Sequence, residues 1–255
     1  MAAERKKTGG AVKGRTVDPR EIARFDAQAA RWWDPKGEMR ALHAINPIRI
    51  DYLRERLARH FGKNPASPKP LAGLRILDIG CGGGLLTEAL AKLGARMTGV
   101  DMAEDALAIA KTHAKASKLA IDYRASDIET VAESGATFDA VVAMEIVEHV
   151  ADLPTFLEAA ARCVRPGGAL ALSTLNRTAK SFLLGIVAAE YVLRLVPQGT
   201  HDWKKFVRPS ELARHLRAAG LSVEDKSGIA VDPFSGRFRL VRDLGVNYLA
   251  FAIRP

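Results

Sequence analysis

Cysteine is nearly absent from this chain of 255 residues. Cys81 and Cys163 are the two that occur, and they stand far apart in different predicted elements. Two distant thiols form neither a disulfide framework nor a cysteine-based metal cluster, which excludes small disulfide-rich scaffolds and zinc modules built on cysteine. We therefore expect a reducing compartment.

Long apolar runs are missing as well. No stretch reaches the roughly 18 consecutive apolar residues of a membrane-spanning helix. The first twenty residues hold six Lys or Arg and two Asp or Glu, and they lack the apolar core of a secretion signal and the apolar stripe of a transit peptide. We interpret residues 1–17 as a disordered basic tail.

What the chain does contain is enough apolar material for one large domain. Hydrophobic residues make up 48% of the sequence, which supports a full core at this length. The formal net charge is +9, from 38 Lys and Arg against 29 Asp and Glu. Such an excess is compatible with RNA, with an acidic membrane surface, or with solubility alone, which is the simplest interpretation.

Strand and helix patterns alternate along most of the chain. Helical patterns separate successive strand patterns, at a spacing that is typical of βαβ units. The fold class is therefore α/β, with a doubly wound, Rossmann-like sheet covered on both faces. The strand patterns occupy residues 75–80, 96–101, 121–126, 138–144 and 168–175, followed by late strands near 221–228 and 246–253.

Two segments stand outside this alternation. Residues 18–63 contain two helical stretches, at 18–33 and 46–61, and we call this segment the N-terminal cap. Its tryptophans, Trp32 and Trp33, either close a ligand pocket or pack the cap on the sheet, and packing is favoured. An insertion at 176–208 follows the fifth strand pattern and is too long for an ordinary connection.

A glycine-rich loop joins the first strand pattern to its helix. In LDIGCGGG (77–84), Gly80 and Gly82 fit the start of the dinucleotide fingerprint, but its third glycine position holds Leu85. The match to NAD binding is thus broken. Asp101 ends the second strand pattern, 21 residues after Gly80, where an acidic side chain binds a ribose diol.

These residues carry a family resemblance. LDIGCGGG followed by GVDM resembles the first motif and the acidic residue after the second strand of class I S-adenosylmethionine-dependent methyltransferases. The resemblance implies a final antiparallel strand and S-adenosylmethionine lying over the glycine loop. It further implies that Gly80 and Gly82 approach the methionyl part and Asp101 holds the ribose hydroxyls. Asp127 would contact adenine, and Met144 would line the adenine or sulfonium side.

A narrower resemblance comes from segments outside the shared fold. Residues 31–49, 144–150 and 173–206 together closely resemble the ubiquinone-biosynthesis O-methyltransferase family, which methylates hydroxyls of a polyprenylated phenol or catechol. The resemblance covers nearly the whole chain and implies that residues 64–255 form the S-adenosylmethionine-binding catalytic domain. It also implies that Arg49 pairs with the cofactor carboxylate, a task suited to a bidentate guanidinium.

Glu145, Glu148 and His149 follow the fourth strand pattern and form an E-x-x-E-H set. By itself this spacing is compatible with exposed or capping side chains, a general acid/base set, or a hard-metal site. The resemblance favours Mg²⁺ held by Glu145 and Glu148, with His149 as a candidate third ligand, because a cation lowers the pKa of a phenol and orients a catechol. Imidazole is an unusual Mg²⁺ ligand, so His149 is either the third ligand or the base that takes the proton. Glu145 and His149 are the candidate catalytic residues.

Within the insertion, residues 181–196 are strongly apolar but too short and too charged to cross a membrane. One interpretation is a core helix. The other is an amphipathic segment that docks on an anionic bilayer with its basic end, Lys204, Lys205 and Arg208, where a polyprenylated substrate is drawn out. We expect a cytoplasmic protein, peripheral at the inner face of the cell membrane, with other ubiquinone-biosynthesis enzymes as further candidate partners.

Two other functions stay open at this stage. The first is a class I methyltransferase acting on another small molecule or on RNA. Amino-group methylases of nucleic acids often carry D/N-P-P-Y/F after the fourth strand, where this chain has AMEIVEH, so we expect no nucleic-acid partner. The second is a noncatalytic lipid- or nucleoside-binding subunit, which the glycine loop together with the E-x-x-E-H set disfavours.

Overall fold

One mixed sheet organises the part of the chain that the computed structural model describes, which is residues 16, 19–27, 29–37, 39–183, 202–232 and 237–255. Its strand order is β3-β2-β1-β4-β5-β8-β6-β7. The first five strands run parallel, and β8 is antiparallel to both β5 and β6. The predicted α/β class and antiparallel final strand are confirmed. The strands are β1 (Arg75–Ile79), β2 (Arg96–Asp101), β3 (Asp122–Ala125), β4 (Phe138–Met144), β5 (Val164–Leu175), β6 (Ser222–Val231), β7 (Phe238–Val241) and β8 (Asn247–Ile253).

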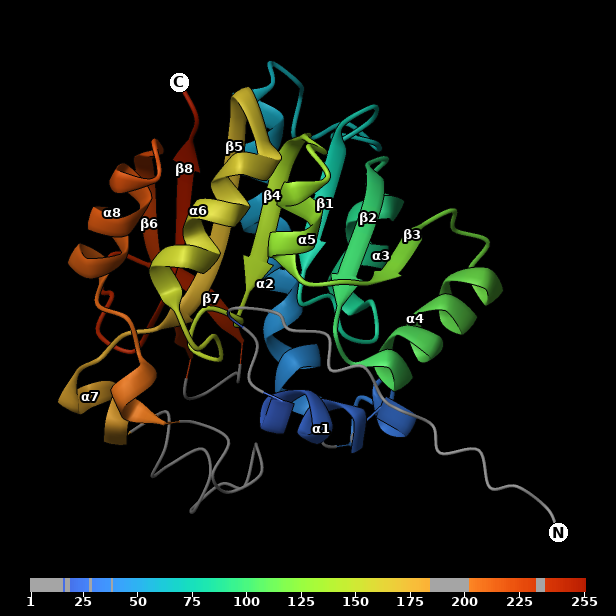
Figure 1. Ribbon diagram of the computed structural model, residues 1–255, viewed down its shortest axis with the longest axis horizontal. Coiled ribbons are helices and arrows are strands. Elements are labelled where there is room, and N and C mark those ends of the chain that lie inside the picture. Colours follow the sequence, from blue (N-terminus) through green and yellow to red (C-terminus); the bar gives the residue numbers. More distant parts are fainter. Residues whose placement is uncertain (1–15, 17–18, 28, 38, 184–201, 233–236) are drawn as a thin grey trace, which may run out of the picture.

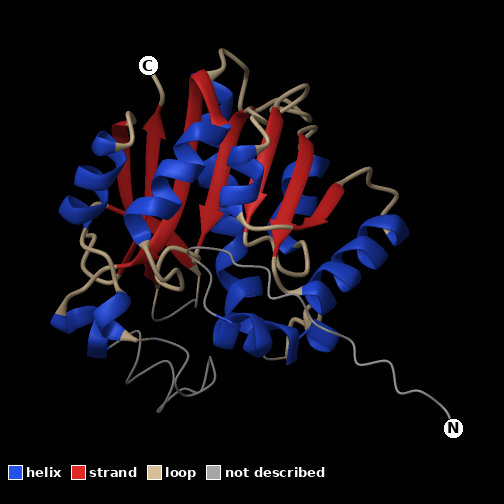
Figure 2. Ribbon diagram, in the orientation of Figure 1, coloured by secondary structure: helices blue, strands red, loops and turns tan. Residues whose placement is uncertain are grey.

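Helices cover both faces of this sheet (Figures 1 and 2). On one face α5, α6 and α8 pack, and on the other face α2 and α3 pack. The helical elements are α1 (Pro19–Ala27), η1 (Ala29–Arg31), α2 (Arg40–His60), α3 (Leu85–Lys92), α4 (Glu104–Ala116), α5 (Ile128–Glu133), α6 (Leu153–Cys163), α7 (Ala179–Ser181), η3 (Trp203–Lys205) and α8 (Pro209–Ala218).

The core follows the alternation of side chains along the strands. In β4, Val141 and Ala143 face the helices α5, α6 and α8, whereas Ala140 and Val142 face α2 and α3. All four are fully buried. A strand buried on both faces reads as a continuous apolar run, which is why β4 is recognisable in the sequence.

The helix α2 differs from its prediction, because it begins at Arg40 rather than at residue 46. Pro47 therefore lies inside the helix, where proline removes one backbone hydrogen bond. Leu53 and Leu57 are fully buried on the same helix. Burial of this face outweighs the lost bond, and the helix continues through the proline.

Several short elements were not predicted, among them the helix α5 and the edge strand β7. The helix α5 has six residues and the edge strand β7 has four, so neither spans enough residues to show a hydrophobic period. Thr16 also differs from its predicted place in the basic tail. It is buried, and its carbonyl oxygen accepts a hydrogen bond from the backbone N–H of Ala151 at 2.8 Å. The rest of that predicted tail lies outside the described residues.

The helix α2 is tied to a strand from the far end of the sequence. The hydroxyl of Tyr52 donates to Asp225 of β6 at 2.8 Å, and the guanidinium of Arg56 donates to the same carboxylate at 2.6 Å. These bonds hold α2 along the sheet. Arg49, one turn earlier, thereby reaches the end of β4, where it meets Glu145.

The first part of the N-terminal cap lies at the carboxyl-end edge of the sheet, where α1 sits below the arrowheads of the central strands (Figure 1). The indole of Trp33 stacks on the imidazole of His113 in α4, with ring centroids 3.5 Å apart. His113 in turn contacts the buried carboxylate of Glu88 in α3, at 2.7 Å. One indole thus anchors the cap to two helices of the sheet domain.

Candidate active site

The predicted site residues come together where the central parallel strands end. The loop 80–84 follows β1, Asp101 ends β2, and Glu145 follows β4 directly. These three strands are neighbours in the sheet, so their carboxyl ends open onto one edge. Ligands of doubly wound sheets bind at such an edge.

Asp101 is fixed toward the glycine loop by backbone donors. Its Oδ2 accepts from the N–H of Gly82 at 2.7 Å, and its Oδ1 accepts from the N–H of Ala103 at 2.8 Å. Burial raises the pKa of this carboxyl group, while the backbone hydrogen bonds oppose that rise. Each oxygen keeps a lone pair for a further donor, such as a ribose hydroxyl.

The glycine loop also receives an aromatic ring from the N-terminal cap. A Cβ added to Gly82 would lie 2.2 Å from Cζ2 of Trp32, and one added to Gly83 would lie 2.3 Å from Cγ of the same indole. The neighbouring indole of Trp33 donates through Nε1 to the carbonyl oxygen of Gly83 at 2.9 Å. Both tryptophans make packing contacts, and Trp32 also lies directly against the glycine loop, so both predicted roles remain predictions. Glycine is required at 82 and 83 for this contact, a reason that sequence reasoning missed.

Gly83→Ala is expected to lower the free energy of unfolding by about 1–3 kcal/mol, the usual cost of overpacking. The added methyl group would clash with Trp32, and the φ angle of Gly83 is not in the left-handed region, so backbone strain adds nothing. Urea denaturation measures the loss. The matched test repeats Gly83→Ala in a Trp32→Ala variant, where it should lower the free energy of unfolding only slightly. Equal losses in both backgrounds would contradict the predicted clash.

Arg49 and Glu145 form an ion pair at the end of β4, in which the arginine is buried and the glutamate is partly exposed. Nη2 of Arg49 lies 3.0 Å from Oε1 of Glu145, and the arginine side chain is 4% exposed. Ser173 of β5 donates through Oγ to the same carboxylate oxygen at 2.7 Å. Nε of Arg49 is buried and has no hydrogen-bond partner among the described residues. Part of the guanidinium is therefore left for an acidic ligand.

Glu145 adopts an unusual backbone conformation. Its φ is +53°, in the left-handed region that non-glycine residues seldom enter. Its N–H donates to the carbonyl oxygen of Ser173 at 3.1 Å, which holds the turn against the neighbouring strand. Strained residues of this kind cluster at functional sites.

Glu148 is the more deeply buried carboxylate of the E-x-x-E-H set, at 3% exposure. Its Oε2 accepts from the hydroxyl of Thr174 at 2.9 Å. Its Oε1 is buried without a hydrogen-bond partner in the described part of the chain. Burial, followed by the negative charge of Glu145, raises the pKa of Glu148 well above its usual range. A cation beside this oxygen would relieve both effects.

His149 contacts the N-terminal cap, and its charge also acts on the buried carboxylate of Glu148. Its Nδ1 lies 3.2 Å from Oε2 of Glu21 in α1. Across the described residues, no three His, Cys, Asp or Glu side chains are grouped so that they hold a metal ion. The set predicted for Mg²⁺ is therefore not assembled as one cluster here, because Glu145 turns to Arg49, Glu148 to Thr174 and His149 to Glu21.

The two residues expected near adenine have structural roles of their own. Asp127 caps α5, accepting from the N–H of Thr130 at 2.7 Å. The residue before it, Ser126, donates its N–H to the carbonyl oxygen of Asp101 at 3.2 Å, so the start of α5 lies next to the end of β2. Met144 ends β4 and packs, partly buried, against the cluster that includes α2.

Sequence reasoning missed Asp78, a buried carboxyl group beneath the glycine loop. The hydroxyl of Thr87 in α3 donates to its Oδ2 at 2.6 Å. Burial raises the pKa of Asp78 to about 7, against the lowering effect of that hydrogen bond. The signal was present, since a single acid interrupts the apolar strand RILDI. Likewise, Ser173 and Thr174 at the end of β5 marked the partners of Glu145 and Glu148.

The chain is similar in sequence to known methyltransferases. A family described as a methyltransferase domain matches residues 77–172. The chain is 52% identical over 245 residues to the ubiquinone biosynthesis O-methyltransferase of Methylobacterium sp. (strain 4-46), covering 96% of this chain and 98% of that protein. It is also 52% identical over 233 residues to the protein of the same name from Azorhizobium caulinodans, covering 91% and 92%.

Solved structures show the same fold at lower identity. Magnesium protoporphyrin IX methyltransferase from Synechocystis PCC 6803 with bound SAH superposes with a TM-score of 0.65 at 18% identity, covering 91% of this chain and 95% of that one. The same enzyme with bound SAM superposes with a TM-score of 0.61, covering 95% and 100%. At this identity the likeness establishes the fold of a methyltransferase.

Proposed function

The chain belongs to the ubiquinone biosynthesis O-methyltransferases, and from that premise we propose that it transfers the methyl group of S-adenosylmethionine to a hydroxyl of a polyprenylated phenol or catechol. The observation that carries this proposal is the length of the similarity, which spans 96% of the chain and so includes the N-terminal cap and the insertion. Proteins that share only the cofactor-binding domain would not need to be similar in either of these two segments.

S-adenosylmethionine supplies a methyl group on a sulfonium, and the residues around the glycine loop fit its other parts. Arg49 would hold the carboxylate, since its buried Nε has no partner among the described residues. Asp101 would hold the ribose hydroxyls, and the backbone of Gly80 and Gly82 would face the methionyl part. Asp127 would lie near adenine, and Met144 near adenine or the sulfonium.

Asp101→Ala is expected to weaken the binding of S-adenosylhomocysteine by about 1.5–3 kcal/mol, as for lost hydrogen bonds to a charged group. The side chain also holds the N–H groups of Gly82 and Ala103, so the loop loses an anchor at the same time. Isothermal calorimetry measures the affinity. Asp122→Ala on exposed β3 serves as the control, and unchanged affinity of the Asp101 variant would refute the ribose assignment.

The acceptor hydroxyl must lose its proton, and the E-x-x-E-H set is suited to that task. A free phenol has a pKa of about 10, so at neutral pH it is seldom an oxyanion. Mg²⁺ would lower this pKa and orient two catechol oxygens. Glu145 and Glu148 would hold it, which is supported by the partnerless Oε1 of Glu148. His149 would be the third ligand or the base, and Glu21 at its Nδ1 would then fix the ring.

Purified protein, a labelled methyl donor and a series of acceptors test the proposed reaction. We expect methylation of polyprenylated phenols or catechols and weak activity on the same rings without the polyprenyl tail. Methylation of an unrelated small molecule or of RNA would instead identify a different methyltransferase. Binding of the donor without any turnover would indicate a noncatalytic subunit.

We also propose that the insertion docks the enzyme on an anionic membrane, at the inner face of the cell membrane. Phe182 and Leu183 are 47% and 59% exposed, and Lys204, Lys205 and Arg208 follow at the other end of the insertion. Among the described helices none is long and apolar enough to cross a bilayer. Docking suits a substrate with an insoluble tail, and it would bring the enzyme near others of the same pathway. The middle of the insertion, 184–201, lies outside the described residues.

Replacing Phe182 and Leu183 by Ser is expected to abolish most binding to anionic liposomes, because burying each apolar side chain contributes about 1.5–3 kcal/mol. Wild-type binding should weaken with salt. Flotation measures both effects, and a third candidate position, Ile186, lies outside the described residues. Leu240→Ser removes an apolar side chain that is 39% exposed on β7 and is the control. Equal flotation of the Ser variant and the wild type would make the insertion a lid or core element.

A further inference from the structure

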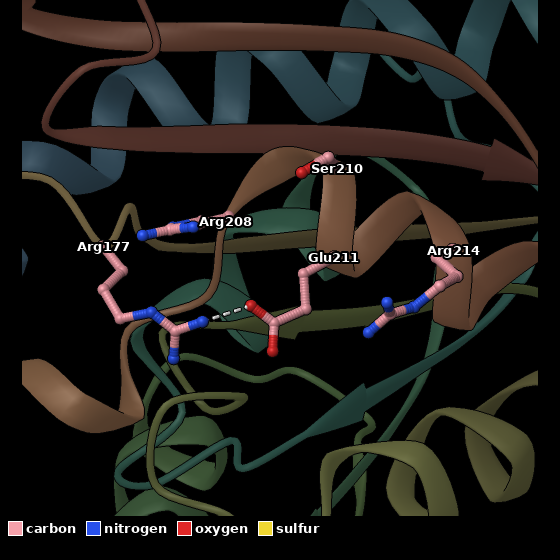
Figure 3. A pocket seen from close by; sticks show the side chains of 5 residues that line it. All are labelled: Arg177, Arg208, Ser210, Glu211 and Arg214. Atoms are coloured by element: carbon pink, nitrogen blue, oxygen red, sulfur yellow. Dashed lines mark hydrogen bonds and ion pairs between the residues drawn. The ribbon is translucent and has the colours of Figure 1, made fainter.

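A hollow of about 370 Å³ lies between the end of β5 and the start of α8. Its lining side chains come from the two ends of the insertion and from the start of α8, and Figure 3 shows Glu211 lying between Arg177 and Arg214. No part of the candidate active site contributes to it. The lining residues are Arg177, Arg208, Ser210, Glu211 and Arg214.

The charge of this hollow is positive, from three guanidinium groups against one carboxylate. Oε2 of Glu211 forms an ion pair with Nη2 of Arg177 at 2.6 Å, and this contact fixes the orientation of the Arg177 guanidinium. In the part of the chain that the structure describes, the side chains of Arg208 and Arg214 have neither a hydrogen-bond nor an ion-pair partner. Two guanidinium groups are therefore available to an anion.

The first turn of α8 adds to this positive potential. Arg208 is the N-cap residue, and no side chain in the described part of the fold caps the helix there. The N–H groups of a helix start carry a partial positive charge that favours anions. Ser210, in the first turn, supplies a hydroxyl donor to the same hollow.

The hollow is joined to the exposed apolar end of the insertion. Arg177 donates to the carbonyl oxygen of Lys204 at 3.1 Å, and the indole of Trp203 donates to that of Thr178 at 3.0 Å. The ring of Phe182 meets Trp203 edge-on, with centroids 6.4 Å apart. The arginines and the exposed Phe182 thus belong to one connected unit.

We propose that this hollow binds the phosphodiester of an anionic phospholipid headgroup, with Arg177, Arg208 and Arg214 as its ligands. Guanidinium groups bind phosphate oxygens through paired, charge-assisted hydrogen bonds. A lipid source is favoured over a free phosphate because the adjoining Phe182 and Leu183 are exposed apolar side chains, suited to the acyl region beside a headgroup. The inference rests on the membrane docking proposed above and names the site that recognises the lipid.

The test compares flotation of full-length variants on vesicles of phosphatidylglycerol mixed with phosphatidylcholine. Arg208→Gln with Arg214→Gln should weaken partitioning about 30-fold, since each basic side chain near an anionic surface contributes about 1 kcal/mol. Arg75→Gln with Arg96→Gln, two exposed arginines at the starts of β1 and β2, removes the same charge elsewhere and should change nothing. Glu211→Gln should strengthen binding several-fold, because it removes the opposing charge and releases Arg177.

The outcomes separate the two proposals. If wild type does not float, membrane docking and the headgroup site are both wrong. If wild type floats and the folded double variant, checked by circular dichroism, floats equally, the headgroup site alone is wrong. Calorimetry with inorganic phosphate is the second arm. Suppose wild type binds phosphate at millimolar concentration, and the double variant loses this binding but still binds vesicles like wild type. The hollow would then be a site for soluble anions, and the lipid assignment would be overturned.

Discussion

Glu145→Gln combined with Glu148→Gln is expected to abolish catechol methylation, a loss of at least about 10³-fold, because a bound cation contributes several kcal/mol to charge stabilisation in such reactions. Both substitutions keep the shape of the side chains and remove their negative charges. Excess EDTA should have the same effect on the wild type, and added Mg²⁺ or Mn²⁺ should restore its turnover.

Stability and cofactor binding provide the controls for this variant. Burial raises the pKa of Glu148, so Glu148→Gln alone should leave the free energy of unfolding unchanged or higher. Glu145→Gln removes the partner of the buried Arg49 and should lower it, so stability is measured for each single variant. The double variant should also lose Mn²⁺ binding. Electron paramagnetic resonance with S-adenosylhomocysteine present measures this binding independently of turnover. Full turnover of wild type in excess EDTA would leave the E-x-x-E-H set as a structural or acid/base element.

Arg49→Met is expected to weaken the binding of S-adenosylhomocysteine by about 2–5 kcal/mol, the range seen when one partner of a buried charge pair is truncated. The guanidinium is buried, and its Nη2 contacts Glu145 at 3.0 Å. Methionine matches the length of the arginine stem and removes the charge. Arg49→Lys keeps the charge without the two-pronged geometry and should give an intermediate loss.

The ligand itself supplies the discriminating control. 5′-Methylthioadenosine has the nucleoside and the sulfur of the cofactor but lacks the carboxylate. Calorimetry should therefore show a large loss for S-adenosylhomocysteine and a small one for methylthioadenosine. Equal losses for both ligands would show that Arg49 acts through Glu145 and the fold of the site. Unchanged affinity for both would refute its assignment to the cofactor.

The sheet and the cofactor edge were predictable because their signals are local. An apolar run such as β4 and a glycine loop before a helix are each read within about ten residues. The spacing from Gly80 to Asp101 is that of one βαβ unit, so the place of Asp101 at the strand end beside the loop was predictable. Its hydrogen bond from the N–H of Gly82 was not predicted. The same reasoning placed Glu145 beyond the end of β4.

Contacts between distant segments were not predictable in this way. The indole of Trp32 against Gly83 joins residues about 50 positions apart, and no periodicity in either segment indicates the other. The same holds for the carboxylate of Glu21 beside His149. The E-x-x-E-H motif indicates which side chains are available as ligands or bases. The ion pairs and hydrogen bonds that they make depend on residues from α1, α2 and β5.

The hydrogen bonds from Tyr52 and Arg56 to Asp225 can form only late in the synthesis of this protein. Asp225 follows Tyr52 by 173 residues, so at about 5–20 residues per second it leaves the ribosome roughly 10–35 s later. During that interval Leu53 and Leu57 have emerged while β8 and β6, which complete the sheet beside α2, have not. The apolar face of α2 can pack early on β1, β4 and β5, but the part of this core that β6 and β8 cover stays exposed until these strands emerge. This is the period in which a holding chaperone would protect the remaining apolar surface.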